Sequence, residues 1–416
     1  MFNISSDYAP PFKMIEPFFK FGSIAFLISI ISLLFIDVNT PLFDLKVVGW
    51  AHLFLLGFVM IVIFGAMAQL IPVALEIGHY KVKLFYYIFP TLAIGTITMV
   101  IGFWFKPFLL PFGGFLVLVS MILFLYETFM TLKATTANSL TVKSVKFGNI
   151  FLTIAIFIGF LMALALSGVI PFDVSRFLPI HIILVLVGYV TVTIIGMSMI
   201  LLPMFGLAHG YDDSDVHRAF WIIVASVIAF SIFQYFDFST LKLITVILIF
   251  GAVGLYLRQM ITLYNIRARK IHDIWYKHIY IAFISLALSV VFGVFWVLLK
   301  SDIALKVMMW FLLIGFFAFI INAHLIKIIP FLVWFERFSP LVGKQKVPML
   351  HEMLPDKDVN FSFWASLAGL LISGFGLLIE SDTLFKGGVV LLAFGAFLMF
   401  QTVLFILNFK PESEDV

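Results

Sequence analysis

The chain consists of long apolar runs separated by short polar segments, and each run is long enough to cross a membrane. A hydrocarbon core of about 30 Å requires about 20 predominantly apolar residues in a helix. Runs of this length recur twelve times, with few charged residues inside them. They predict helices near residues 19–36, 47–74, 84–105, 107–131, 146–168, 178–207, 218–236, 239–264, 274–299, 304–334, 360–379 and 384–408.

The predicted helices use most of the chain and leave little structure outside the membrane. We expect an all-α membrane protein with a single polytopic domain, in which residues 19–408 form a twelve-helix bundle. Residues 1–18 are predicted to be a cytoplasmic N-terminal segment and 409–416 a C-terminal tail. The longest loop, at 335–358, mixes basic and acidic residues and suits contact with lipid headgroups or a partner subunit.

Composition and cysteine content exclude several classes of protein. Hydrophobic residues make up 63% of the chain and charged residues 12%, whereas soluble domains carry about 25% charged residues. A soluble enzyme is therefore excluded. The absence of cysteine excludes thiolate metal sites, iron–sulfur clusters and covalent haem attachment, so a metal or haem would need His, Met or oxygen ligands.

The distribution of Lys and Arg predicts the orientation of the chain. With twelve spans, both termini and the even-numbered loops share one side of the membrane, and that side holds all but seven of the 26 basic residues. The seven on the other side are Lys46, Lys106, Arg176, Lys242, Lys300, Lys306 and Lys386. Basic residues are retained in the cytoplasm, so we expect both termini there, in a prokaryotic inner or plasma membrane. The net charge of +4 reflects this topology and does not indicate nucleic acid.

The second, sixth and tenth predicted helices carry an internal repeat. They align without gaps on a proline near the cytoplasmic end, and two further columns hold small residues. Such residues let neighbouring backbones, or a flat cofactor, approach closely. The columns are Gly57, Gly188 and Gly315; Gly65, Gly196 and Ala323; and Pro72, Pro203 and Pro330. Because these helices are four spans apart, we expect three pseudo-symmetric four-helix repeats.

Two histidines, His52 and His181, lie near the outer ends of the second and sixth helices. His52 precedes Gly57 by five residues and His181 precedes Gly188 by seven; two residues correspond to about 200° on an α-helix. This offset is compatible with two imidazoles that face each other from equivalent helices, as the axial ligands of one haem iron do. The simpler alternative is that each is a solvated or capping residue at the lipid interface.

Four other residues complete the predicted haem site. Gly57 and Gly188 would leave room for a flat ring, and Lys46 and Arg176 lie near the outer surface, where they would neutralise the propionates. The absence of cysteine excludes a covalently attached c-type haem, and the cofactor that we expect is a b-type haem.

Part of the sequence resembles a known family, subunit I of the haem–copper oxidase superfamily. The resemblance lies in Ala51-His52-x-Phe54, in the region of Gly65 and in Leu70-Ile71-Pro72. It covers one helix as a motif and most of the chain as architecture. It implies twelve spans, threefold pseudo-symmetry, an axial haem ligand at His52, and a role in electron transport or as an oxidoreductase.

The sequence departs from that family at its other metal ligands. In the tenth helix, the positions that correspond to the family's histidine ligands hold Met308, Met309 and Trp310, and the seventh helix has no histidine pair. Four residues after His181, where the family has a tyrosine, stands Val185. We therefore expect neither copper nor a conventional oxygen-reducing centre. A haem between the second and sixth helices is an arrangement that the resemblance does not itself supply.

His324, with Asn322 and Lys327, lies in the inner half of the tenth helix. Polar groups inside a membrane are costly and therefore candidates for function. His324 is a candidate haem ligand opposite His52, but it lies fourteen residues from the column of His52, which is about 21 Å of helix rise. The alternative is that Lys327 extends to the cytoplasm and His324 makes one interhelical hydrogen bond.

A further group of polar residues follows the first two repeat prolines. Helix capping and contact with headgroups are the simpler interpretation, and an inner divalent metal site is the alternative. The group comprises Glu76, His79, His209, Asp212, Asp213 and Asp215.

Three functions are consistent with these patterns. The first is a membrane haem protein that transfers electrons or handles a small gas such as nitric oxide or oxygen; two histidine ligands favour electron transfer. The second is a twelve-helix secondary transporter, although most spans lack ionisable residues near their centres. The third is a cofactor-free accessory subunit. The expected partners are membrane lipid and an electron donor or partner subunit.

Overall fold

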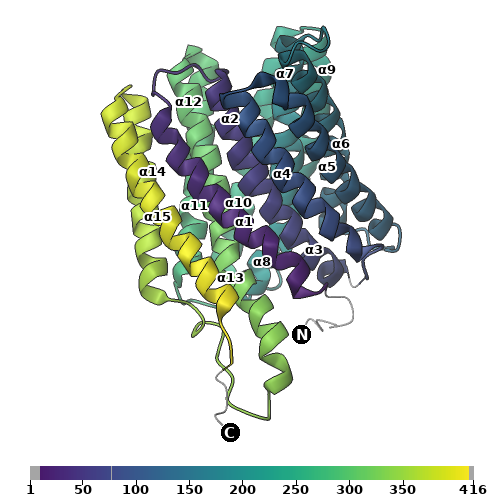
Figure 1. Ribbon diagram of the computed structural model, residues 1–416, viewed down its shortest axis with the longest axis vertical. Coiled ribbons are helices and arrows are strands. Elements are labelled where there is room, and N and C mark those ends of the chain that lie inside the picture. The colour runs from purple at the N-terminus through teal and green to yellow at the C-terminus, as the bar shows by residue number, and fades with distance from the viewer. Residues whose placement is uncertain (1–9, 76, 412–416) are drawn as a thin grey trace. The chain divides into compact units, whose positions relative to one another are not determined.

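The computed structural model describes residues 10–75 and 77–411, except for the side chains of 73–75. This part of the chain is all helical and contains no strand. Within it, twelve helices are long and apolar enough to cross a membrane, which confirms the predicted all-α protein with twelve spans (Figure 1).

Several spans consist of two or three consecutive elements, because 3₁₀ or π-helical segments interrupt the α-helix. In chain order the spans are α1 (Phe12–Ser32) with η2 (Leu33–Phe35); α2 (Leu45–Phe54), η3 (Leu55–Met60) and α3 (Ile61–Leu75); η4 (Val82–Leu84) and α4 (Phe85–Trp104); η5 (Pro107–Leu109) and α5 (Leu110–Leu132); α6 (Leu140–Leu166); α7 (Val174–Ile183), η6 (Leu184–Thr191) and α8 (Val192–Gly206); α9 (Ser214–Tyr235); α10 (Ser239–Ile266); α11 (Ile274–Leu299); α12 (Asp302–Trp310), η7 (Phe311–Ala318) and α13 (Phe319–Arg337); α14 (Asp356–Leu378); and α15 (Asp382–Asn408). The loop after α13 contains the 3₁₀ turn η8 (Ser339–Leu341).

Two helices begin six or more residues earlier than the apolar runs predict. α1 begins at Phe12 and α6 at Leu140, where the sequence predicts starts near 19 and 146. Burial of residues such as Ile15 holds the first turns of α1. The start of α6 is capped by Ser139, whose hydroxyl accepts a hydrogen bond from the backbone N–H of Val142 at 3.3 Å.

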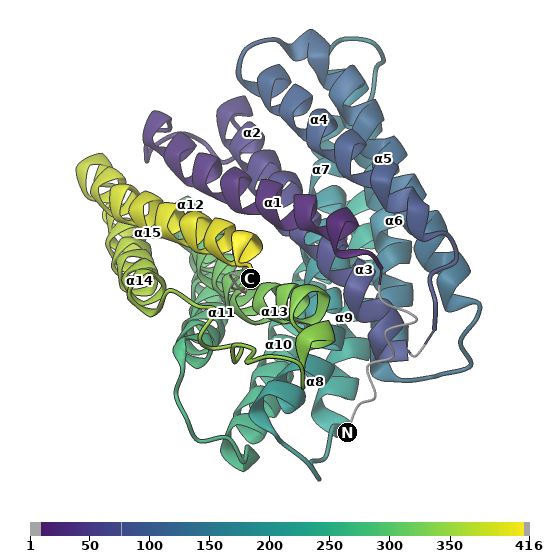
Figure 2. The ribbon, with the colours of Figure 1, turned by 60° about the horizontal axis from the view of Figure 1, so that its bottom comes forward.

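The chain forms two compact units. One unit contains residues 70–271, with α4 to α10; the other contains residues 10–69 and the chain from 272 on, with α1, α2, η3 and α11 to α15. In the first unit α4 packs against α5, α5 against α6, and α9 against α10. In the second, α14 packs against α15, and α1 lies alongside α15 (Figure 2).

Glycines allow the paired helices to approach to backbone contact. A Cβ on Gly113 of α5 would lie 2.6 Å from the backbone N of Met99 in α4. A Cβ on Gly369 of α14 would lie 2.6 Å from the carbonyl oxygen of Gly388 in α15. Any larger residue would force these helices apart, so the glycines set the spacing of both pairs.

The second, sixth and tenth spans each contain a π-helical segment, namely η3, η6 and η7. These segments end at Met60, Thr191 and Ala318, which occupy one column of the sequence alignment. π-helical segments are rare and frequently occur at functional sites. Their shared position therefore marks one column of the alignment as a candidate functional region in all three spans.

Four of the aligned glycines have a common packing role, because each faces the span that precedes its own in the chain. A Cβ on Gly188 would lie 3.0 Å from Phe151 of α6, and one on Gly315 would lie 2.5 Å from Ser285 of α11. In the other column, Gly65 lies against Phe18 of α1 and Gly196 against Ser144 of α6.

Candidate functional site

His181 is held firmly against α6. Its helix, α7, is capped by Asp173, which accepts a hydrogen bond from the backbone N–H of Arg176 at 3.1 Å. The ring Nδ1 of His181 lies 2.9 Å from the carbonyl oxygen of Ala155. A Cβ on Gly159 would lie 2.8 Å from the ring Cε1, so the imidazole sits directly on the α6 backbone.

The hydrogen bond to Ala155 defines the tautomer of the neutral imidazole. A carbonyl oxygen only accepts, so Nδ1 must carry the proton and donate. The lone pair of the neutral ring then lies on Nε2. This is the arrangement commonly found for metal-binding histidines, whose other nitrogen donates to a carbonyl or carboxylate.

His52 has the same tautomer on a different support. Its helix, α2, is capped by Asp44, which accepts from the backbone N–H of Lys46 at 2.8 Å. The Nδ1 of His52 donates to the carbonyl oxygen of Val48, one turn earlier in the same helix, at 2.8 Å. His52 belongs to one unit and His181 to the other, so their pairing stays a prediction.

Aromatic side chains stack along the span that carries His52. Trp50 stacks on Phe54 with 6.0 Å between ring centroids, and Phe58 stacks on Phe26 at 4.5 Å. Among the described residues, the buried indole N–H of Trp50 has no hydrogen-bond acceptor. A buried donor of this kind normally has a partner, so an acceptor group beside α2 would satisfy it.

The two predicted propionate partners are both exposed. Lys46 lies in the first turn of α2. Arg176 lies 3.5 Å from Asp173 and 5.9 Å from the ring of Tyr235. Hydrogen bonds from the Ser175 hydroxyl and the Arg176 N–H hold the pKa of Asp173 below its ordinary value, so this carboxylate competes for Arg176.

The predicted glycines differ in what the structure describes around them. Gly57 is buried within η3. Gly188 lies against Phe151 of α6, which favours helix packing over contact with a flat ring at that position.

His324 lies on α13, where its Nδ1 donates to the carbonyl oxygen of Ile320 at 2.7 Å. Its ring meets the edge of Trp275 with centroids 6.3 Å apart. Lys327 forms an ion pair with Asp273 at 2.7 Å. Its charge is therefore compensated within the protein and does not depend on extension to the cytoplasm alone.

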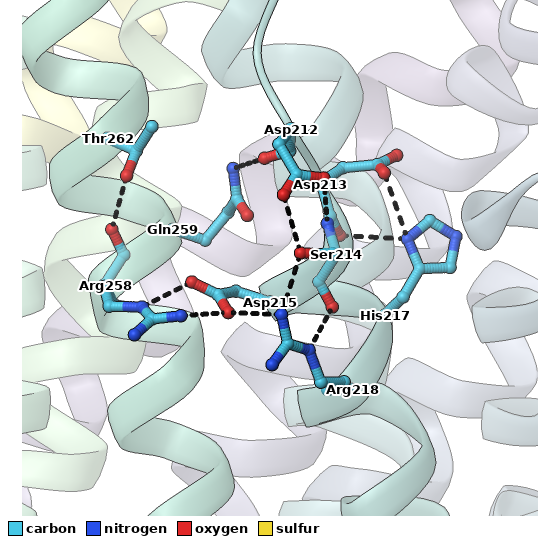
Figure 3. A network of polar contacts seen from close by, with 9 residues as sticks. All are labelled: Asp212, Asp213, Ser214, Asp215, His217, Arg218, Arg258, Gln259 and Thr262. Carbon is cyan, nitrogen blue, oxygen red and sulfur yellow. Dashed lines mark hydrogen bonds and ion pairs between the residues drawn. The ribbon is translucent and has the colours of Figure 1, made fainter.

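The acidic residues at the start of α9 belong to a polar network (Figure 3). Asp212 accepts hydrogen bonds from the backbone N–H and the hydroxyl of Ser214, at 3.0 and 2.8 Å. These bonds, led by the hydroxyl, lower the pKa of Asp212. Asp215 binds Arg258 through both carboxylate oxygens and lies 3.4 Å from Arg218.

The network is accounted for by turn formation and ion pairing. No group of three or more potential metal ligands occurs in the described part of the chain. Glu76, one of the predicted inner ligands, lies outside the described residues.

One pair of residues was missed by sequence analysis. His79 and Glu127 are 48 positions apart, and their side chains are hydrogen-bonded at 2.8 Å near the C-terminal end of α5. The available signal was that Glu127 is the only charged residue in the run 107–131, because ionisable residues inside a span indicate function.

These features define the chain as a polytopic α-helical membrane protein with two hydrogen-bonded histidines near the ends of separate spans. The chain matches no protein-family model and no curated protein sequence.

Proposed function

We propose that the protein is a membrane haem protein of haem–copper oxidase subunit I-like architecture. In this proposal His52 and His181 are the axial ligands of one b-type haem near the outer face, and the protein transfers electrons or acts in the redox chemistry of a small gas. The supporting observation is that both imidazoles donate through Nδ1 to main-chain carbonyls. Both neutral rings therefore carry the lone pair on Nε2.

The donor set fits haem and does not favour copper. Neutral imidazole is a standard axial ligand, and a bound haem would supply one-electron redox chemistry at its iron. The chain's own residues fix the tautomers, place aromatic side chains on the helix that carries His52 and offer the indole N–H of Trp50 to an acceptor. Lys46 and Arg176 are proposed to neutralise the propionates, with Asp173 as a competitor for Arg176.

We also propose a threefold arrangement of four-helix repeats. Two observations support it: the π-helical segments of the second, sixth and tenth spans end in one aligned column, and at least one aligned glycine faces the preceding span in each repeat. The proposal includes cytoplasmic termini, based on the distribution of Lys and Arg.

The test is an oxidised and a dithionite-reduced visible spectrum of the purified protein, with a pyridine haemochrome assay. The comparison includes His52→Ala, His181→Ala and, as a control, His217→Ala, which changes a partly exposed histidine bonded to Asp213 at the start of α9. We expect a sharp low-spin spectrum and about one haem per chain in the wild type and the control, and loss of that spectrum in both other variants.

The absence of haem after expression in a haem-replete host would refute this function. The transporter and the cofactor-free subunit would then be the accounts to test. If either His52→Ala or His181→Ala retains the full haem content, the assignment of that histidine as an axial ligand is refuted.

A further inference from the structure

The inner end of α5 contains a carboxyl group with no exposure to solvent. Glu127 is 0% exposed and lies about one and a half turns before the end of the helix. Its Oε1 accepts a hydrogen bond from the Thr131 hydroxyl at 2.7 Å and lies 2.8 Å from Nδ1 of His79. The side chain of His79 is 3% exposed, so both members of the pair are enclosed.

The segment after α3 is fixed over this carboxyl group. The backbone N–H of Tyr80 donates to the Thr131 hydroxyl at 3.0 Å, and Thr131 in turn donates to Glu127. The ring of His79 also meets the edge of Phe85 in α4, with centroids 5.3 Å apart. The pair is therefore part of the packed structure and not a chance contact of surface side chains.

Only one of the two carboxyl oxygens is satisfied. Among the described residues, the buried Oε2 of Glu127 has no hydrogen-bond partner. A buried ionised carboxylate normally needs several donors, and leaving one oxygen unpaired costs free energy. A proton on Oε2 would remove the charge from that oxygen.

Other unsatisfied polar atoms lie at the same level of the α5–α6 interface. Gly114 of α5 faces Ala163 of α6, and fourteen residues, or about four turns along each antiparallel helix, lead to Thr128 and Asn149. The hydroxyl of Thr128 and Oδ1 of Asn149 are both buried without partners among the described residues. A polar site of this kind suits an internal water.

We propose that Glu127 and His79 form a proton-binding site that exchanges protons with the aqueous phase on the side of the membrane where α5 ends. With a carboxylate and a neutral imidazole the pair carries one negative charge. Uptake of one proton from water makes its net charge zero, and no electron is transferred. The site does not depend on the proposed haem.

Among the described residues, the segments packed against α5 contribute no second acid. Apart from His79 and Glu127, the described titratable side chains on these segments and on α5 are tyrosines and lysines: Tyr80, Lys81, Lys83, Tyr86, Tyr87, Tyr126, Lys133, Lys143 and Lys146. We therefore assign the exchangeable proton to the His79–Glu127 pair.

Infrared difference spectroscopy of the lipid-reconstituted protein during a pH titration tests this proposal. We expect a C=O band of a buried protonated carboxyl group, which Glu127→Gln abolishes. The matched control is Glu380→Gln, an exposed glutamate in the loop between α14 and α15, and it should leave this band in place. His79→Asn should move the pH midpoint of the band, because the imidazole shares the proton.

A second measurement makes the test independent of folding of the variants. Wild-type protein grown with ¹³C-carboxyl glutamate should show an isotope shift of the same band. The proposal is overturned if the labelled wild type shows no such shift, if Glu127→Gln keeps the band, or if His79→Asn leaves its midpoint unchanged.

Discussion

Replacing Gly159 with alanine tests how α6 holds His181. A Cβ at this position would lie 2.8 Å from Cε1, 3.3 Å from Nδ1 and 3.7 Å from Nε2 of the imidazole. Carbon atoms in contact normally lie about 3.5–4.0 Å apart. The ring must therefore retreat by about 0.7 Å, directly away from the helix that accepts its hydrogen bond.

The cost follows from this displacement. Moving the ring outward stretches the 2.9 Å bond from Nδ1 to the Ala155 carbonyl to about 3.6 Å, where it no longer counts as a hydrogen bond. Losing the bond costs about 1 kcal/mol, and overpacking costs about 1–3 kcal/mol. The better helix propensity of alanine returns about 1 kcal/mol. We expect Gly159→Ala to lower the free energy of unfolding by about 2 kcal/mol.

Gly251→Ala in α10 is the matched control, because no heavy atom lies within 4 Å of a Cβ at that position. It should be neutral or stabilise the protein by up to about 1 kcal/mol. The assay is the midpoint of thermal unfolding in detergent, with the visible spectrum as a second readout. If Gly159→Ala is as stable as Gly251→Ala and its spectrum is unchanged, the close contact of His181 with α6 is wrong.

Three further predictions concern other contacts. Gly113→Val should force α4 and α5 apart and reduce the yield of monodisperse protein in size-exclusion chromatography, since even a Cβ there would collide with the α4 backbone. Trp310→Phe should lower the free energy of unfolding by about 1 kcal/mol or more, because it removes the 3.0 Å bond from the indole N–H to the Leu370 carbonyl. Ser175→Ala should bring the pKa of Asp173 closer to its ordinary value. A lowered pKa stabilises the fold at pH values above the ordinary pKa, and this stabilisation is lost as the pH falls through the lowered pKa. The thermal midpoints of wild type and variant should therefore differ at neutral pH and converge in acid.

The sequence predicts the membrane spans well because each span is an uninterrupted apolar run. The seams at Lys106 and Asp237 are correctly placed, although almost nothing separates the helices there. The start of α1 could not be obtained in this way, because burial of Ile15 by other helices holds turns that the local pattern leaves polar. Long-range packing, not local hydrophobicity, decides such boundaries.

The candidate sites were predicted unevenly. His52 and His181 stand out from the sequence because few polar residues occur in these spans. The pairing of His79 with Glu127 could not be predicted, since it depends on a loop that folds back over the end of α5. The contact of His181 with Ala155 likewise requires knowledge of which face of α6 meets α7.

The π-helical segments change the angular argument for the two histidines. The offset of about 200° between His52 and His181 assumes continuous α-helix. However, part of a π-helical segment lies between each histidine and its aligned glycine: the six-residue η3 after His52 and the eight-residue η6 after His181. A π-helical turn holds more residues than an α-helical one, because its hydrogen bonds run from i to i+5. Each residue therefore turns the chain by less than 100°, and the length of the π segment helps to set the direction of the histidine.

Deleting one residue from η3 tests this directly. Removing Leu56 should restore i to i+4 bonding, and five α-helical residues turn the chain by about 500°, nearly as far as the six residues of the π segment, each of which turns it by less than 100°. The preceding helix α2 should therefore keep its direction, and we expect little change in the thermal midpoint or in any haem spectrum. Deleting Ile63 from the α-helical part of the same span, in α3, removes a residue where the helix has none to spare and should rotate α2 by about 100°, with a lower thermal midpoint and loss of any haem spectrum. If the two deletions have equal effects, the π segment does not accommodate an extra residue, and the direction of His52 is set by the loop and the helix packing instead.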